Sequence, residues 1–284
     1  MPARRSAWHD APEFKQYVED WLIPREVDGA DAASYVPADR VLHVGIEMSD
    51  AAQLERLRTW GKSYAGFFAR LREDPKINTR CLGRNYLHNG TYPTPDAEVY
   101  AAMIFDFRPL TILEIGAGYS TLIARKTARE LAEPCRVIAV DPEPRTDLAG
   151  EADAVIARHV EAIPLETLPV GRRSLLFIDS SHIVRSGGDV PYIYNALLPS
   201  LLAGTLVHVH DIFLPYDYPA MYKRRLYTEQ YVLQALLSHS DRYRVVFATH
   251  YMTRKYPEAM RAIFGDVVGR EDCYYGASFW LEVR

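Results

Sequence analysis

Histidines and carboxylates gather at the ends of two apolar runs of the chain. The run SLLFID ends at Asp179, with His182 three residues later, and the run GTLVHVHD ends at His210 and Asp211. Two carboxylates and an imidazole that converge on one point are ligands for a divalent metal ion. The pattern predicts a metal site made of Asp179, His210 and Asp211. Oxygen ligands favour Mg and an added imidazole favours Mn, Fe or Zn, so the identity of the metal stays open.

Packing offers an alternative interpretation of each residue taken alone. Asp179 is also suited to cap a following helix, and His210 is also suited to be a buried, hydrogen-bonded strand residue. His208 alternates with His210 one pleat deeper in the same run, which predicts a packing role for His208. The functional interpretation therefore depends on the four polar residues acting as a group.

The elements that must position these residues are the strands of a parallel sheet. Apolar runs alternate with helical patterns, which is typical of a sheet covered on both faces. The runs occupy residues 111–116, 136–141, 154–160, 174–179 and 204–211. Two more strand candidates, residues 243–252 and 277–283, are suited to a terminal pair with one antiparallel member. Ligands of such sheets bind outside the carboxyl ends of the strands, and four runs carry an acid there: Glu114, Asp141, Asp179 and Asp211.

A glycine turn follows the first of these runs. In LEIGAGYST, residues 113–121, Gly116 and Gly118 permit a tight strand-to-helix turn and a close approach of the backbone to a ligand. Thr121 stands where a dinucleotide fingerprint has its third glycine, which argues against NAD. Glu114 suits an ammonium group or a bridging water. Asp141, at the end of the second run, is able to accept hydrogen bonds from both hydroxyls of a ribose.

LEIGAGYST and VIAVDPEP together resemble the first two motifs of class I S-adenosylmethionine-dependent methyltransferases, and the resemblance extends from about residue 88 to the end of the chain. It implies a Rossmann-like, doubly wound α/β fold with a seven-stranded, mostly parallel sheet. It also implies S-adenosylmethionine as co-substrate. The implied contacts to the co-substrate are Glu114, Gly116, Gly118, Ser120, Thr121, Asp141, Glu161 (near the adenine) and Asp179.

The loop DSSH resembles a second, narrower pattern. O-methyltransferases of macrolide sugars and the cephalosporin hydroxylase-like methyltransferases carry Asp-x-x-His after the fourth strand and Glu-Asp after the fifth. Carried over by motif, the resemblance implies that Asp179 and Asp211 are metal ligands and that His182 is the general base, with Asp179 beside it in the catalytic group. The sequence departs from the pattern at His210, where the family has Glu. That departure weakens the expectation of Mg and leaves metal-free catalysis by His182 open.

Aromatic and polar residues outside the strands are candidates for the wall of an acceptor pocket. They are Tyr92, Tyr216, Tyr218, Tyr222, Glu229 and Gln230, and they fit either a sugar face or an aromatic acceptor. Asn89, Tyr92 and Thr94 precede the core and are placed to close over the co-substrate. Surface or core packing is the alternative role for each of these residues.

Bulk properties set the remaining expectations. The chain has 284 residues, 48% of them hydrophobic and 25% charged, with a net charge of -4, which is typical of a globular protein without a nucleic-acid surface. No secretory signal and no membrane-spanning run is evident, and the cysteines are few and widely spaced, so we expect a cytoplasmic protein. A homo-oligomer is left open.

Helical patterns at residues 11–23 and 49–73, the latter with Ser49 or Asp50 as N-cap, indicate a helical N-terminal extension or lid over 1–95. A helix over 95–107 then opens the methyltransferase domain, 96–284.

These features predict a methyltransferase (EC 2.1.1.-) that methylates a hydroxyl of a small molecule or sugar in specialised metabolism. His182 is the predicted base, with or without help from a divalent metal. Two alternatives stay open. One is another S-adenosylmethionine chemistry, such as cyclisation or aminocarboxypropyl transfer, because one fold hosts many reactions. The other is a non-catalytic S-adenosylmethionine-binding protein.

Overall fold

The computed structural model describes residues 45–219, 222, 225–269 and 276–284. The predicted helix over 11–23 lies outside these residues. All seven predicted strands are present in one sheet with the order β3-β2-β1-β4-β5-β7-β6. Their bounds are β1 Thr111–Ile115, β2 Arg136–Val140, β3 Ala154–Ile156, β4 Ser174–Ile178, β5 Leu206–Val209, β6 Tyr243–Ala248 and β7 Phe279–Val283.

Strand direction and register bring the predicted polar residues to one edge of the sheet. Strands β1 to β5 are parallel, and β7 is antiparallel to both β5 and β6. Ile115 pairs with Val140 on one side and with Ile178 on the other, and Ile178 pairs with Val209. The residues that follow these strand ends are therefore neighbours. The chain order reverses between β1 and β4, which is the point where sheets of this type bind their ligands.

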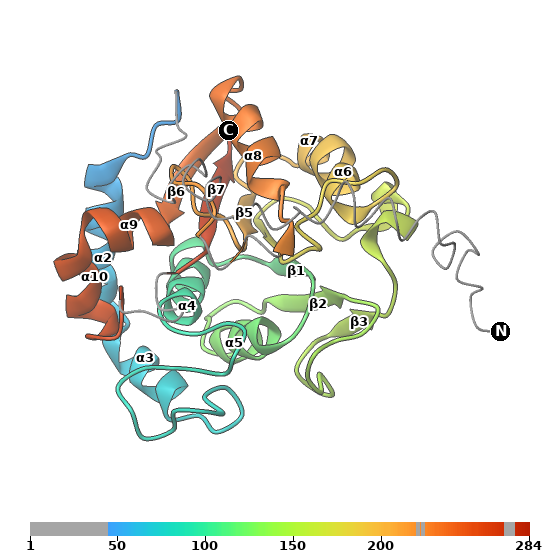
Figure 1. Ribbon diagram of the computed structural model, residues 1–284. Helices are drawn as coiled ribbons and strands as arrows, with labels where there is room; N and C mark the ends of the chain where they lie inside the picture. The colour runs from blue at the N-terminus through green and yellow to red at the C-terminus, as the bar shows by residue number, and fades with distance from the viewer. Residues whose placement is uncertain (1–44, 220–221, 223–224, 270–275) are drawn as a thin grey trace, which may run out of the picture.

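Helices cover both faces of the sheet. Figure 1 shows α4 (Asp96–Phe107) and α5 (Tyr119–Ala128) together on one side, and α6 (Asp189–Tyr192), α7 (Leu198–Ser200) and α8 (Glu229–Ser238) on the other. A π-helical turn over Ile193–Leu197 joins α6 to α7, and 3-10 turns occupy Val160–Ala162 and Leu165–Thr167. This arrangement is a doubly wound, Rossmann-like α/β fold with a seven-stranded, mostly parallel sheet, so the predicted fold class is confirmed.

Helix α2 (Asp50–Ser63) packs against the β6 edge of the sheet, and α9 (Thr249–Lys255) and α10 (Pro257–Phe264) lie beside it (Figure 1). Helix α3 (Ala65–Arg72) packs instead on α4 and α10, through the ring contacts of Phe67 with Phe105 and of Phe68 with Phe264. The Trp60 ring lies 4.8 Å from that of Phe247, and the side-chain oxygen of Gln53 accepts a hydrogen bond from the Ala248 amide at 2.8 Å. The described part of the N-terminal region therefore shares one hydrophobic core with the sheet.

The prediction that Ser49 or Asp50 caps the helix at 49–73 through its side chain is wrong. Ser49 precedes α2, but its backbone is left-handed (φ 53°) and its side chain makes no capping bond. Asp50 instead accepts hydrogen bonds from the hydroxyls of Tyr251 and Tyr256, each at 2.6 Å. The helical pattern is interrupted at Tyr64, where φ is -119° and ψ is 1°, and the Tyr64 hydroxyl donates to Asp106.

Candidate functional site

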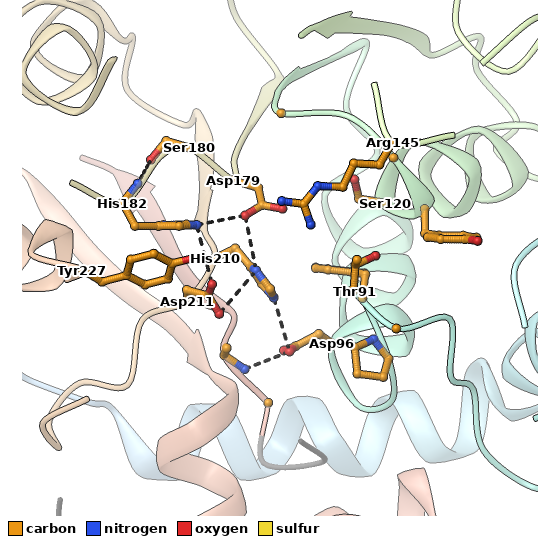
Figure 2. Close-up of a pocket in the computed structure, with 18 of the residues that line it drawn as sticks. Thr91, Asp96, Ser120, Arg145, Asp179, Ser180, His182, His210, Asp211 and Tyr227 are labelled. Carbon is orange, nitrogen blue, oxygen red and sulfur yellow. Dashed lines mark hydrogen bonds and ion pairs between the residues drawn. The ribbon is translucent and has the colours of Figure 1, made fainter. Parts of the chain in front are cut away.

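A cavity of about 260 Å³ lies at the carboxyl ends of β1, β2, β4 and β5 (Figure 2). One wall is the glycine turn with Asp141. The loop before α4 and residues that follow β5 contribute other parts of the lining. The predicted residues that line the cavity are Tyr92, Gly116, Gly118, Ser120, Asp141, Asp179, His182, His210, Asp211 and Tyr222. Co-substrate residues and metal-ligand residues predicted from different motifs thus share a single space.

Glycine is needed at the two positions of the turn for different reasons. Gly116 has φ +83°, and a Cβ atom built on it would lie 2.1 Å from the backbone oxygen of Asp179, so only glycine fits there. Gly118 has extended backbone with φ 174°, and a Cβ built on it would meet only Arg145, at an ordinary 3.7 Å. The protein itself therefore tolerates a methyl group at position 118, and the cavity beside it is the reason to expect glycine.

Asp141 is held rigidly at the end of β2. Its Oδ2 accepts a hydrogen bond from the Ala117 amide at 2.7 Å, and its Oδ1 accepts one from the Glu143 amide at 2.7 Å. Each carboxylate oxygen has a second lone pair. The oriented side chain keeps two acceptor positions in the cavity.

Glu114 and Thr121 do not line the cavity, contrary to the prediction that they contact the co-substrate. Glu114 is fully buried beneath the turn. It accepts hydrogen bonds from Tyr100 Oη at 2.9 Å and from Thr121 Oγ1. Burial raises the pKa of Glu114 to about 7 despite these hydrogen bonds. The pair Glu114 and Thr121 supports the turn from below, because Thr121 Oγ1 also accepts from the Gly118 amide at 3.2 Å.

Asp179, His210 and Asp211 come together as the sequence predicts. Each offers one ligand atom, and these atoms lie within 4.8 Å of one another. His210 Nδ1 lies 3.5 Å from Asp179 Oδ1 and 3.8 Å from Asp211 Oδ1 (Figure 2). A cation bound between two acids and one imidazole needs such a spacing.

Asp96 faces the ring of His210 from the other side. His210 Nε2 lies 3.7 Å from Asp96 Oδ2, and Asp96 is itself fixed by the amides of Ala277 at 2.8 Å and Ser278 at 3.0 Å. A carboxylate behind the distal nitrogen of a histidine is the usual support for a metal ligand, because it leaves the other nitrogen free to bind. The donor set and its support therefore fit a divalent metal ion.

The charges of the cluster shift its pKa values strongly. Burial raises the pKa of Asp179, but the nearby His210 and the hydrogen bond from His182 outweigh burial and hold that pKa well below its ordinary value. Burial lowers the pKa of His210, but the charges of Asp211 and Asp179 raise it well above its ordinary value. The cluster thus concentrates paired charges at the bottom of the cavity.

His182 contacts three carboxylates. Its Nδ1 lies 2.7 Å from Glu229 Oε2, and its Nε2 lies 3.1 Å from Asp179 Oδ1 and 3.6 Å from Asp211 Oδ2. Burial lowers the pKa of His182, but the hydrogen bonds to Asp179 and Glu229 raise it well above its ordinary value. The backbone of His182 is left-handed (φ 60°), as is that of Asp211 (φ 53°). Such conformations in residues other than glycine concentrate at functional sites.

Aromatic side chains form the wall next to Asp211. The Tyr222 hydroxyl donates to Asp211 Oδ1 at 2.7 Å. The Tyr227 ring lies 4.5 Å from the His182 ring, and the guanidinium of Arg225 lies over the Tyr222 ring at 4.6 Å. The prediction of Tyr222 as a wall residue agrees with its place in the cavity lining.

Other predicted acceptor contacts lie away from the cavity. Gln230 is buried and holds the loop after β5, because its Oε1 accepts from the Phe213 amide at 2.9 Å and its Nε2 donates to the Tyr216 carbonyl at 3.3 Å. The Tyr216 ring packs under the guanidinium of Arg254 at 4.4 Å. The Tyr218 hydroxyl accepts from the Gln230 amide at 3.1 Å. Glu229 is buried against His182. These four residues build the wall from behind.

Three further predicted residues lie outside the cavity lining. Glu161 lies in the 3-10 turn after β3, 4.0 Å from His159 and outside the cavity lining. Asn89 bonds the amides of Thr91 and Tyr92 through its own side chain. Thr94 donates to Glu98 Oε1 at 2.8 Å. Tyr92 does line the cavity, and its hydroxyl lies 3.2 Å from Ser278 Oγ.

His208 has the packing role predicted for it. It is fully buried, its ring stacks on Phe177 at 4.1 Å, and its Nε2 lies 2.9 Å from Ser278 Oγ. Burial lowers its pKa well below the ordinary value.

Several lining residues carried no recognisable motif in the sequence. They are His88, Thr91, Asp96, Arg145, Arg225 and Tyr227. Figure 2 shows the side chain of Arg145 extending over the cavity toward Asp179. Asp96 looked like an ordinary acid in the first turn of a helix, and only its place opposite His210 reveals its role. Arg145 follows Asp141 closely, so the loop after the second motif was the one available signal.

Comparison with known protein families supports the methyltransferase resemblance of the glycine-turn motif. Residues 113–212 match the model of a methyltransferase domain family, Methyltransf_24. The matched segment runs from β1 to just beyond β5 and contains the glycine turn, Asp141 and the Asp179–Asp211 cluster. The resemblance to a methyltransferase is therefore confirmed over this segment.

Individual relatives are distant. An uncharacterized protein of Archaeoglobus fulgidus is 33% identical over 102 residues, which are 36% of this chain and 44% of that protein. The O-methyltransferase from Bacillus cereus in complex with SAH is 18% identical, with a TM-score of 0.39 over 98% of this chain and 100% of that one. The SAH-bound methyltransferase PaMTH1 from Podospora anserina is 17% identical, with a TM-score of 0.42 over 92% and 97% of the two chains. No residue role follows from likenesses of this size. In the part of the chain that the structure describes, every helix is too short or too polar to cross a membrane.

Proposed function

We propose that the protein is an S-adenosylmethionine-dependent methyltransferase that methylates a hydroxyl group of a small molecule or sugar in specialised metabolism. One observation carries the proposal. The glycine turn and Asp141 share a cavity with Asp179, His182, His210 and Asp211. A donor site and a group able to remove a proton are thus within reach of one bound acceptor.

The co-substrate side of the cavity suits an adenosyl group. Asp141 has oriented lone pairs for the two ribose hydroxyls. Gly118 permits a close approach of the ligand, and Ser120 faces the cavity at the start of α5. Arg145 extends over the same space (Figure 2) and offers a cation to the methionine carboxylate.

Asp179, His210 and Asp211 would hold a divalent metal ion. Such an ion, when bound, lowers the pKa of a hydroxyl that coordinates it. The mixed acid and imidazole set favours Mn, Fe or Zn over Mg. His210 presents Nδ1 to the two acids because Asp96 lies behind its Nε2.

His182 is the proposed proton acceptor. The acceptor oxygen attacks the methyl carbon in line with the sulfur, the carbon–sulfur bond breaks, and S-adenosylhomocysteine leaves with the bonding electrons. The hydroxyl proton passes to His182 Nε2. The ring accepts a proton only when it is neutral. A cation held by Asp179 and Asp211 would offset the charge of the two acids beside Nε2 and so would favour the neutral ring.

A direct test starts with calorimetry of the protein against S-adenosylmethionine and S-adenosylhomocysteine. The protein is then incubated with S-adenosylmethionine carrying a tritiated methyl group and a panel of sugars, phenols and hydroxylated lactones. We expect donor binding that Asp141→Ala weakens, and label transfer that EDTA abolishes and Mn²⁺ restores. Release of methylthioadenosine in place of S-adenosylhomocysteine would contradict methyl transfer. No affinity for either nucleoside would refute the proposal as a whole.

A further inference from the structure

The first residue of α8, Glu229, is a carboxylate in an unusual setting. Its exposed fraction is 0%, and among the described residues its only recorded ion pair is the one with His182. Glu229 Oε2 accepts hydrogen bonds from His182 Nδ1 at 2.7 Å and from Ser180 Oγ at 3.1 Å. A buried carboxylate without a Lys or Arg partner is costly to a fold. Its presence therefore points to a task that a neutral side chain does not perform.

The same helix end also fixes the backbone of His182. The carbonyl oxygen of His182 accepts hydrogen bonds from the amides of Thr228 at 2.8 Å and Glu229 at 3.0 Å. The hydroxyl oxygen of Thr228 accepts one from the amide of Val184 at 2.8 Å. The left-handed backbone of His182 and its ring are thus both held by the start of α8.

These contacts assign the two ring nitrogens to different tasks. A carboxylate only accepts hydrogen bonds, so Nδ1 of His182 carries a hydrogen and donates it to Glu229. Nε2 is the nitrogen that faces Asp179, Asp211 and the cavity (Figure 2). A carboxylate behind a catalytic histidine fixes its tautomer and orientation in this way.

We infer that Glu229 is a positioning residue, which holds the His182 ring through its hydrogen bond to Nδ1 so that Nε2 faces the cavity where the acceptor would lie. The inference rests on the proposed function for its catalytic consequence. The geometry of the Glu229–His182 pair, however, is measurable without any acceptor.

The first experiment examines the hydrogen bond itself by NMR of ¹⁵N-labelled full-length protein. A proton shared between an imidazole nitrogen and a buried carboxylate resonates far downfield and exchanges slowly with water. We expect such a proton on His182 Nδ1, assigned through its ¹⁵N partner and absent from His182→Ala. Glu229→Gln, which keeps the size of the side chain, should move it upfield or lose it. Its absence from the unsubstituted protein would overturn the inference.

The second experiment is a double-mutant cycle with an acceptor from the panel above. Glu229→Gln should lower kcat about 10–100-fold, the usual loss for a supporting partner of a functional histidine. The KM for S-adenosylmethionine should change less than about threefold. In the His182→Ala background the same substitution should lower kcat less than about twofold, because the two residues act as one unit.

Glu98→Gln is the matched control. Glu98 is equally buried and bonds Arg72 and Thr94, outside the cavity lining. It should lower the melting temperature while leaving kcat unchanged. Equal losses from Glu229→Gln with and without His182 would show a merely structural role and overturn the inference. Absence of label transfer by the unsubstituted protein would instead defeat the proposed function, with the NMR result still deciding how His182 is held.

Discussion

Glu114 gives the clearest quantitative prediction about the fold beneath the site. Its side chain is fully buried, and burial raises its pKa from 4.5 to about 7. Between these two values the folded protein binds more protons than the unfolded chain, so the free energy of unfolding falls as pH rises through this window. A pKa raised from 4.5 to about 7 corresponds to about 3.5 kcal/mol once Glu114 is fully ionised, and to about 3 kcal/mol at pH 7, where it is half ionised in the folded protein.

The perturbation is Glu114→Gln, which keeps the shape and removes the titration. Urea unfolding of both proteins is followed by circular dichroism at several pH values from about 4 to 8. At the acid end the two proteins should have similar stability, because the buried carboxyl is neutral in both states. By pH 7 the variant should gain about 3 kcal/mol over the unsubstituted protein, or about 1 M in urea midpoint for a slope near 3 kcal/mol per M.

A stability difference that stays constant across this range would refute the reasoning, because it would mean that Glu114 does not titrate with a raised pKa. The same variant examines the predicted contact with the co-substrate. Glu114 lies outside the cavity lining, so affinity for S-adenosylhomocysteine should change less than about threefold. If the variant instead lost more than about tenfold in affinity for S-adenosylhomocysteine, or about 1.4 kcal/mol, Glu114 would contact the co-substrate directly, as the sequence predicted.

Three other predictions concern the cavity. Gly118→Ala should leave the melting temperature within about 2 °C but weaken the binding of S-adenosylmethionine at least tenfold by calorimetry. Gly116→Ala should lower the free energy of unfolding in urea by about 2 kcal/mol or more, because its Cβ meets the Asp179 carbonyl. Asp211→Asn should reduce Mn²⁺ affinity at least tenfold by calorimetry while S-adenosylhomocysteine affinity stays within about threefold, and unchanged Mn²⁺ affinity would remove Asp211 from the ligand set. His182→Ala should keep co-substrate affinity and lower label transfer by about two to four orders of magnitude, and normal turnover would show that His182 is not the base.

The positions of the strands were predictable because their cause is local. Each strand buried on both faces is a continuous apolar run, and each run ends where polar residues and turn residues begin. The polar residues Asp141, Asp179, His210 and Asp211 follow directly after strands. Parallel strands in register place such residues at one edge, so their convergence followed from the pattern alone.

The acceptor wall was less predictable because an aromatic or polar residue near a site has two equally common uses. Gln230 and Tyr218 bond each other and the loop after β5. They shape the wall without facing the cavity. No local spacing distinguishes these two orientations, since the choice depends on which neighbours offer unpaired amides.

The amino-acid sequence by itself determined the alternation of strands and helices, the glycine turn and the grouping of acids and histidines at one sheet edge, because periodicity and strand ends are properties of neighbouring residues. Only the tertiary structure decided how these groups are supported. Glu229 meets His182 from 47 residues away, Asp96 stands behind His210 from another helix, and Glu114 lies under the turn and outside the cavity. Such contacts depend on how separate elements pack against one another, and packing is set by the whole fold, beyond any single segment.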